Sequence, residues 1–200
     1  MERSPLFDPN WQYAAPLALE DFALPDWKLL AAQRPPYQAQ LQATQALRLL
    51  VASKDDPSFG YQVNNFRHSI QSATLALADG RPDEYVVAAL LHDIGFIACP
   101  PTHGEFAARL LQPYVDPSIV WMLERHMHFL AAHYSEHPTA DRNAREAWRG
   151  HPHFEMTAEF VQRYDQNAID PGAREADLAV FEPIVRRVFA KTPRAIPLPP

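Results

Sequence analysis

A run of six apolar residues, 86 to 91, ends directly in His92 and Asp93, and this junction constrains the chain more than any other segment. An apolar run of this kind belongs in a protein interior, so the two polar side chains stand where a buried segment ends. Histidine offers a neutral nitrogen ligand, and aspartate offers an anionic oxygen that can bridge two cations. The pair alone is weak evidence for a metal site, because adjacent residues often meet by chance.

Four further side chains that can bind metal are spread along the chain, most of them in segments that we expect to be helical. His68 lies 24 residues before His92, and His103 lies 11 residues after it. His126 follows after a further 23 residues, and Asp165 after another 39. A single histidine is more often a surface or capping residue than a ligand, but these residues fit together as a set. We therefore predict a metal site built from several helices.

The remaining histidines are expected outside this set. His128 is two positions from His126 and points to another side of the helix. His133 is seven positions from His126, on the same face but two turns away, and could at most line the pocket. Three others sit among proline and polar residues and are expected at the surface: His137, His151 and His153.

Helical periodicity covers most of the chain after residue 36, and no period-2 segment indicates a strand, so we predict an all-α fold. Pro82, followed by Asp83 and Glu84, is typical of a helix start. Residues 102–105 have the pattern of a capping box. The expected helices cover residues 37–54, 66–79, 82–92, 103–111, 117–130, 141–149, 154–165 and 177–190.

Residues 1–36 differ from the rest of the chain, because they are rich in proline and in aromatic residues such as Phe7, Trp11 and Trp27. Proline at this density resists long helices, whereas the aromatic residues are too many for a free tail. We predict an N-terminal arm over 1–36 that packs on a domain formed by 37–200. The arm either covers the surface or also lines the active site.

Composition excludes several classes of function. The net charge is −6 and the 18 basic residues form no dense cluster, which argues against binding to nucleic acid. Cys99 is the only cysteine, so no intrachain disulfide is possible and an intracellular location is expected. No apolar stretch follows the first charged residues as in a signal peptide, and no apolar run approaches the roughly 20 residues of a membrane helix. We expect a soluble cytoplasmic protein with no membrane partner.

His68, the pair His92-Asp93 and a distant aspartate on a helical scaffold resemble the HD domain superfamily, over roughly residues 61–189. The resemblance implies a helical bundle around a dinuclear metal site. It implies that one ion is held by His68, His92, Asp93 and Asp165. It implies that His103 and His126 hold a second ion, with Asp93 bridging the two.

Two chemistries occur in that superfamily. Most members are phosphohydrolases, in which metals activate water and stabilise the leaving oxygen. A smaller branch comprises mixed-valent diiron oxygenases, represented by myo-inositol oxygenase and the oxygenases that cleave aminohydroxyphosphonates. The oxygenase branch implies two Fe ions in the Fe(II)/Fe(III) state and the partners dioxygen and a small hydroxylated molecule. Mn or other divalent metals are the alternative, since histidine and carboxylate suit both Fe and Mn.

Three local features resemble the oxygenase branch. Residues 68–73 read His-Ser-Ile-Gln-Ser-Ala, similar to the His-x-x-Gln-Ser/Thr-Ala of both oxygenase types. Asn64-Asn65-Phe66, just before this motif, is similar to the inositol enzyme. Tyr164-Asp165 resembles the aromatic-Asp segment that carries the last iron ligand. Gln71, one turn from His68, suits a hydrogen bond that supports a ligand residue rather than the metal itself.

One position departs from both branches. Four residues after His92, relatives place a Lys or His that touches substrate, whereas this chain has Phe96. A benzyl group cannot pair with a phosphate, so it counts more strongly against a phosphohydrolase. We predict a diiron oxygenase of a small hydroxylated substrate, with a phosphohydrolase of nucleotides or other phosphate esters as the alternative. A ligand-binding protein without catalysis is the third interpretation. The candidate pocket residues are Tyr61, Asn65, Phe96 and Arg125.

Overall fold

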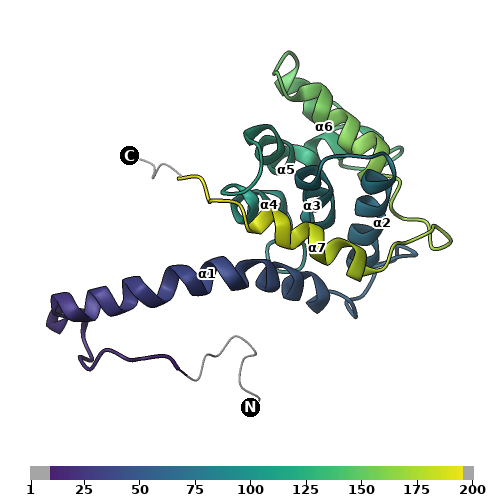
Figure 1. Ribbon diagram of the computed structural model, residues 1–200. Coiled ribbons are helices and arrows are strands. Elements are labelled where there is room, and N and C mark those ends of the chain that lie inside the picture. Colours follow the sequence, from purple (N-terminus) through teal and green to yellow (C-terminus); the bar gives the residue numbers. More distant parts are fainter. Residues whose placement is uncertain (1–9, 196–200) are drawn as a thin grey trace.

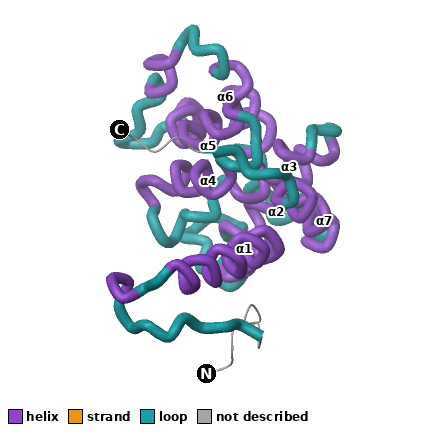
Figure 2. Tube along the Cα trace, turned by 60° about the vertical axis from the view of Figure 1, so that its left-hand side comes forward, coloured by secondary structure: helices purple, strands orange, loops and turns teal. Residues whose placement is uncertain are grey.

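The computed structural model describes residues 10–195 of the 200-residue chain, so Phe7 of the predicted arm lies outside the described residues. Every regular element in this part is helical and no strand occurs in it, which confirms the predicted all-α class (Figure 2). The α-helices are α1 (Leu24–Ala52), α2 (Asn65–Ala78), α3 (Asp83–Leu91), α4 (His103–Leu111), α5 (Pro117–Leu130), α6 (Phe154–Phe160) and α7 (Leu178–Phe189). The shorter helical turns are η1 (Leu19–Asp21), η2 (Pro100–Thr102), η3 (Ala131–His133), η4 (Ala144–Trp148) and η5 (Val161–Asp165).

Side-chain caps explain where several helices begin. Asn64 accepts a hydrogen bond from the backbone N–H of Arg67 at the start of α2. Asp116 accepts one from the N–H of Ser118 at the start of α5. These bonds satisfy amides that have no partner inside the helix. The predicted capping box at α4 is wrong, because the Thr102 side chain makes no capping bond and η2 leads directly into the helix.

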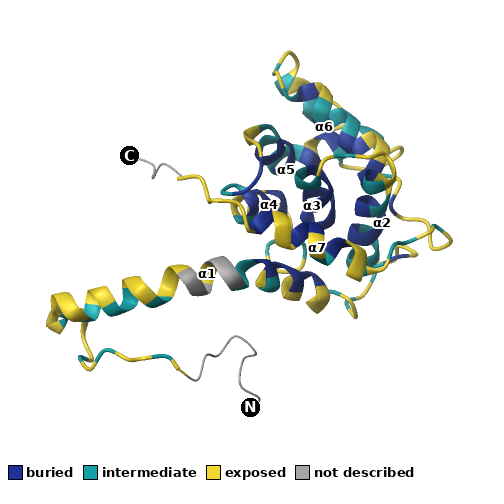
Figure 3. Cartoon of the chain, viewed as in Figure 1, coloured by how far each residue is buried: buried dark blue, intermediate teal, exposed yellow. Residues whose placement is uncertain are grey.

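Helix α3 forms the centre of the bundle. All of its residues from Tyr85 to Leu91 are buried, and it contacts α2, α4, α5 and α7 (Figure 3). A short helix that is apolar on every side has to be enclosed in this way. His92 directly follows its last turn, so the histidine and Asp93 begin inside the protein rather than at its surface.

Helix α1 differs from the prediction, since it begins at Leu24 rather than near residue 37 and runs through Pro35 and Pro36. Its second half packs against α7 and buries apolar residues, including Leu47 and Leu50. Its first half projects away from the bundle (Figure 1). The predicted boundary between residues 36 and 37 falls inside this helix.

The described part of the N-terminal arm packs on α1 rather than on the bundle. Gln12 and Gln33 exchange two hydrogen bonds, from the Gln12 N–H to Gln33 Oε1 and from Gln33 Nε2 to the Gln12 carbonyl. The rings of Phe22 and Trp27 lie 5.1 Å apart. No residue from 10 to 35 is buried, and the arm over 1–36 stays a prediction because its first nine residues lie outside the described part. Among the described helices, none combines the length and apolar character needed to cross a membrane.

Candidate metal centre

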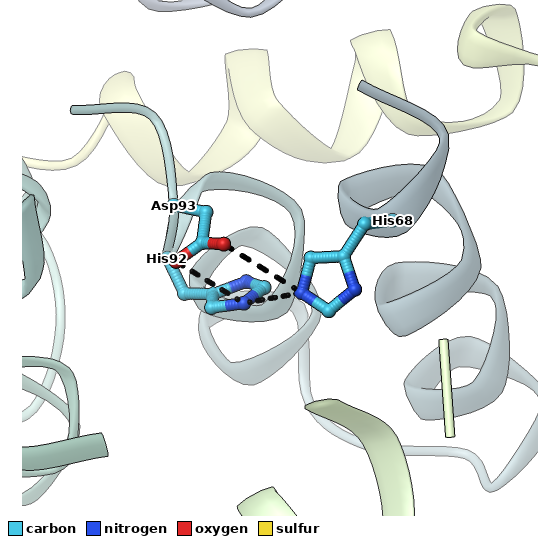
Figure 4. A group of neighbouring side chains, drawn as sticks. All are labelled: His68, His92 and Asp93. Carbon is cyan, nitrogen blue, oxygen red and sulfur yellow. Dashed lines mark hydrogen bonds and ion pairs between the residues drawn. The ribbon is translucent and has the colours of Figure 1, made fainter. Parts of the chain in front are cut away.

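The bundle brings six side chains from five separate segments into one cluster, and they are the six that the sequence analysis selected. His68 comes from α2, His92 and Asp93 from the end of α3, and Figure 4 shows His68 pointing toward that pair. The other three are His103 at the start of α4, His126 on α5 and Asp165 at the end of η5. We call these six residues the His/Asp cluster.

One half of the His/Asp cluster surrounds the Nε2 atoms of His68 and His92, which are 3.0 Å apart. Asp165 Oδ1 lies 3.3 Å from the Nε2 atom of His68 and 3.7 Å from that of His92. Asp93 joins this half through Oδ2, which is 3.7 Å from His68 Nε2. These donor atoms are close enough to share one ion.

The other half surrounds Asp93 Oδ1. This oxygen is 2.9 Å from His103 Nε2 and 3.3 Å from His126 Nε2. The two histidine nitrogens are themselves 3.1 Å apart. Asp93 therefore lies between the two halves, with one oxygen facing His68 and the other facing His103 and His126.

The hydrogen bonds of the four histidines fix their tautomers. Each ring places Nδ1 within 2.8 to 3.1 Å of a backbone carbonyl oxygen, which requires the proton to be on Nδ1. The carbonyls belong to Ala168, Ala89, Pro100 and Leu123. Nε2 is then a lone pair directed into the cluster. Two lone pairs about 3 Å apart repel each other unless a cation or a proton lies between them, so the donor set fits bound metal ions.

The carboxylates are held in the form that binds metal. Burial opposes ionisation of Asp93, but in the metal-free protein His92, His103 and His126, when they carry a second proton on Nε2, keep its pKa well below the usual range. Burial also opposes ionisation of Asp165, and its pKa is likewise lowered by His68 and His92. Asp165 Oδ2 is buried without a hydrogen-bond partner among the described residues. A buried carboxylate oxygen with no partner is costly unless a ligand satisfies it.

Local structure orients two residues of the cluster, Asp165 and Asp93. Residues Val161–Asp165 form a π-helical turn after α6, and the wider turn changes the direction in which Asp165 leaves the helix. The phenol of Tyr164, next to it, donates to Asp79 Oδ2 and accepts from Arg81 Nε. Asn65 at the start of α2 donates from Nδ2 to the backbone oxygen of Asp93 at 3.0 Å. Both ends of the cluster are therefore tied to neighbouring helices.

A cavity of about 340 Å³ lies beside the His/Asp cluster, and His68, Asp93 and Asp165 line it. Most of its remaining wall is apolar or aromatic, and no lysine or arginine is among the lining residues that the structure describes. A volume of this size suits a small molecule. Because the cavity reaches three cluster residues directly, a bound molecule would contact the candidate metal centre.

The predicted pocket residues divide into two groups. Tyr61, Asn65 and Phe96 line the cavity, and the Phe96 ring lies 5.5 Å from that of His103. Arg125 does not line it: its guanidinium pairs with Glu124 and lies over the rings of Trp121 and Trp148. No described residue of the arm lines the cavity either, since its first lining residue is Pro57.

Gln71 supports the site indirectly. Its Nε2 atom donates to the Asp170 carbonyl and to Glu175 Oε1, both at 2.8 Å, rather than to a cluster residue. It therefore fixes the loop after η5, and the same loop begins next to Ala168, the residue whose carbonyl accepts from His68. The predicted hydrogen bond to a ligand residue is therefore corrected: the described bonds of Gln71 hold the loop after η5.

Sequence reasoning missed several cavity residues, namely Phe59, Tyr134, Gln166, Leu130 and Ile169. Tyr134 is the most informative, because burial, together with the charges of Asp165, Tyr61 and Asp93, raises the pKa of its phenol to about 12. The phenol is therefore uncharged. No spacing in the sequence connects these positions, although His133 was expected at most to line a pocket and does so.

No family model matches the chain. Among curated proteins, it is similar to the 1-hydroxy-2-(trimethylamino)ethylphosphonate dioxygenase (glycine-betaine-forming) of Leisingera caerulea. The two are 28% identical over 171 residues, which cover 68% of this chain and 85% of that protein. The predicted resemblance to oxygenases that act on hydroxylated phosphonates is confirmed, and the similarity supports an enzyme of oxygenase type.

Proposed function

We propose that this protein is a dinuclear iron oxygenase of the HD domain type, which oxidises a small hydroxylated organic molecule with dioxygen. The observation that carries the proposal is the position of Asp93 between two pairs of histidines whose Nε2 atoms face each other. One ion would be held by His68, His92, Asp93 and Asp165. The other would be held by Asp93, His103 and His126, with Mn or another divalent metal as the alternative to iron.

Iron held there would supply the electrons and the Lewis acidity that an oxidation by dioxygen requires. The chain's own residues keep the centre in the required form. Four backbone carbonyls hold the histidines as neutral ligands, and Asn65 holds the backbone of Asp93.

The cavity supports oxidation over phosphoryl transfer. Phosphoryl transfer needs cationic groups around the charge that develops on the phosphate oxygens. In the described part of the chain no lysine or arginine lines the cavity. The ring of Phe96 lies beside that of His103, at a position where phosphoryl transfer would need a cationic side chain. The similarity to a dioxygenase favours the same choice.

The experiment is a comparison of oxygen consumption and phosphate release by the same protein. Protein purified without oxygen and loaded with iron is supplied with a reductant and a panel of small hydroxylated molecules. The panel includes 1-hydroxy-2-(trimethylamino)ethylphosphonate, the compound named for the relative. Dioxygen uptake that requires both iron and one panel member is expected. A coupled mixed-valent signal in low-temperature electron paramagnetic resonance is expected from the partly oxidised protein.

The phosphatase arm uses the protein loaded with Mn²⁺ or Mg²⁺ and a set of nucleotides and generic phosphate esters. Little phosphate release is expected. Efficient release that is unaffected by removing oxygen would overturn the oxygenase proposal and favour the phosphohydrolase. Asp141→Ala, a change at an exposed aspartate outside the His/Asp cluster, is the control and should behave as the unchanged protein in both arms.

A further inference from the structure

His133 is a polar residue in the cavity wall that the candidate metal centre does not use. It ends η3, which follows α5 directly, so it stands seven residues after His126. Its Nε2 atom is buried and has no hydrogen-bond partner among the described residues. A buried polar atom without a partner normally costs free energy. Because His133 lines the cavity, a molecule bound there could supply a partner for its imidazole once the ring adjusts.

The imidazole of His133 is held in its uncharged form. Burial lowers its pKa, and the nearby guanidinium of Arg145 lowers it further. Arg145 itself pairs with Glu146 and does not line the cavity. A neutral imidazole forms hydrogen bonds with uncharged partners without contributing a charge of its own.

The surroundings of His133 restrict what can bind beside it. Tyr134 follows it in the sequence, and the other lining residues include Leu130, Ile169 and the aromatic side chains of Phe59 and Phe96. The rings of Phe59 and Phe96 lie 6.2 Å apart. A carboxylate or phosphonate placed against this wall would lose its hydration and find no lysine or arginine among the described lining residues. An ammonium group would be repelled by bound metal ions and, outside the His/Asp cluster, would find no carboxylate among the lining residues that the structure describes.

We infer that His133 contacts the substrate, and that its imidazole forms a hydrogen bond with an uncharged polar group at the end of the substrate that lies away from the His/Asp cluster. The inference rests on the proposed function, in that the hydroxylated end of the molecule is taken to face the metal centre. It adds a specificity residue and a substrate class: hydroxylated molecules whose far end carries an amide, hydroxyl or carbonyl rather than a charge. The few polar groups in an apolar pocket are the ones that fix orientation.

Three matched probes test this class. All three share a 1,2-diol head and differ in the far end: 3,4-dihydroxybutanamide is neutral, 3,4-dihydroxybutanoate is anionic and 4-aminobutane-1,2-diol is cationic. Binding is measured by titration calorimetry on protein loaded with Zn²⁺, which neither donates electrons nor needs oxygen. The neutral amide is expected to bind at least about tenfold more tightly than either charged probe, as expected when burying a charge has no compensation.

Variants of His133 then identify the residue responsible. His133→Leu should weaken binding of the amide by about tenfold, a loss typical of one hydrogen bond, whereas His133→Gln should retain most of the affinity. His128→Leu is the control, because His128 is exposed and its ring packs on Trp148 outside the cavity. Metal content is measured for every variant, so that lost binding is not confused with a lost centre.

Three results would overturn the inference: tighter binding of a charged probe, no binding of any probe, or an equal effect of His133→Leu and His128→Leu. Because the assay uses zinc without turnover, its outcome is separate from the oxygenase test. Binding of the amide that depends on His133, without oxygen consumption by the iron-loaded protein, would retain this inference and reject the oxidation. Oxygen consumption by the iron-loaded protein, with binding that does not depend on His133, would support the oxidation and reject this inference.

Discussion

His103 and His126 point their Nε2 atoms at each other across 3.1 Å, although they belong to different helices and are 23 residues apart in the sequence. Their Nδ1 atoms donate to the carbonyls of Pro100 and Leu123, so in the neutral imidazoles neither Nε2 carries a proton to donate. The nearest carboxylate oxygen to both is Asp93 Oδ1, within 3.3 Å of the two nitrogens, and an oxygen of Asp165 lies within 4.8 Å of a His126 nitrogen. This geometry is costly for a protein without metal and favourable for one that binds a cation there.

Asp93→Ala tests whether one carboxylate serves both halves of the His/Asp cluster. The change removes a ligand from each proposed ion and leaves the two cations without the anion between them. We expect loss of most of the bound metal, from about two ions per chain, with helix content retained. Metal analysis and far-ultraviolet circular dichroism measure both quantities. Full metal occupancy in the variant would contradict a dinuclear centre, and Asp141→Ala should bind as the unchanged protein does.

His103→Ala and His126→Ala should act on one ion only. Each removes one of the two nitrogen ligands of the second ion, and both leave His68, His92 and Asp165 in place. Bound metal should fall from about two per chain toward one in either variant, because affinity follows the number of ligands. His128→Leu is the matched control on the same helix as His126. If both alanine variants keep two ions, the histidines are structural and the centre is mononuclear.

Metal binding should be weakened by acid in a range set by His68. Burial would lower the pKa of this imidazole, but Asp165 and Asp93 raise it above the ordinary value of about 6.5. Metal-free protein therefore still holds a proton on His68 somewhat above that pH, and an incoming ion has to displace it. In that protein the proton stabilises the fold below about pH 6.5, and this contribution is lost as the pH rises through the raised value.

The measurement is a metal titration by calorimetry near pH 7 in two buffers with different ionisation enthalpies. We expect proton release on binding, and an apparent affinity that rises with pH through the titration of His68. The pKa values of Asp93 and Asp165 are lowered, so both side chains stay ionised as the pH falls below the usual carboxylate range. Their protonation therefore affects metal binding only at strongly acidic pH. Identical apparent enthalpies in the two buffers would show that no proton leaves and would contradict this account.

The class of fold and the members of the His/Asp cluster could both be predicted from the sequence. The two predictions rest on different signals. Helix starts are local events, so Pro82 with Asp83 and Glu84 marks the start of α3 without knowledge of the rest of the structure. The six cluster residues were found because their spacing matches a known superfamily. Neither signal depends on how the helices pack.

The features that sequence reasoning missed depend on packing. Helix α1 continues through Pro35 and Pro36, although each proline lacks the N–H that an interior helix position needs. Phe59, His133 and Tyr134 line one cavity although Phe59 comes from the loop before α2 and the other two follow α5. Arg125 has the charge expected of a substrate contact, but Trp121 and Trp148 hold it elsewhere.

Gly104 supplies the final prediction, because it lies where α4 and α5 approach most closely at the centre. A Cβ atom at this position would be 2.5 Å from the Leu123 carbonyl oxygen and 3.1 Å from the His126 ring. That oxygen is the one that accepts the hydrogen bond from His126 Nδ1 at 2.8 Å. Gly104→Ala must therefore push α4 away from α5 or displace the carbonyl that orients the histidine. We expect the free energy of unfolding to fall by about 1–3 kcal/mol, as for other overpacked cores. We also expect bound metal to fall from about two ions per chain toward one, since a ligand that loses its supporting hydrogen bond binds more weakly. Denaturant unfolding and metal analysis measure the two effects.

Gly172→Ala is the control, because its Cβ would meet only the Asp170 side chain at 3.4 Å, an ordinary contact. Unchanged metal content together with lowered stability would mean that the helices separate without moving His126, and would contradict the role given to the Leu123 carbonyl.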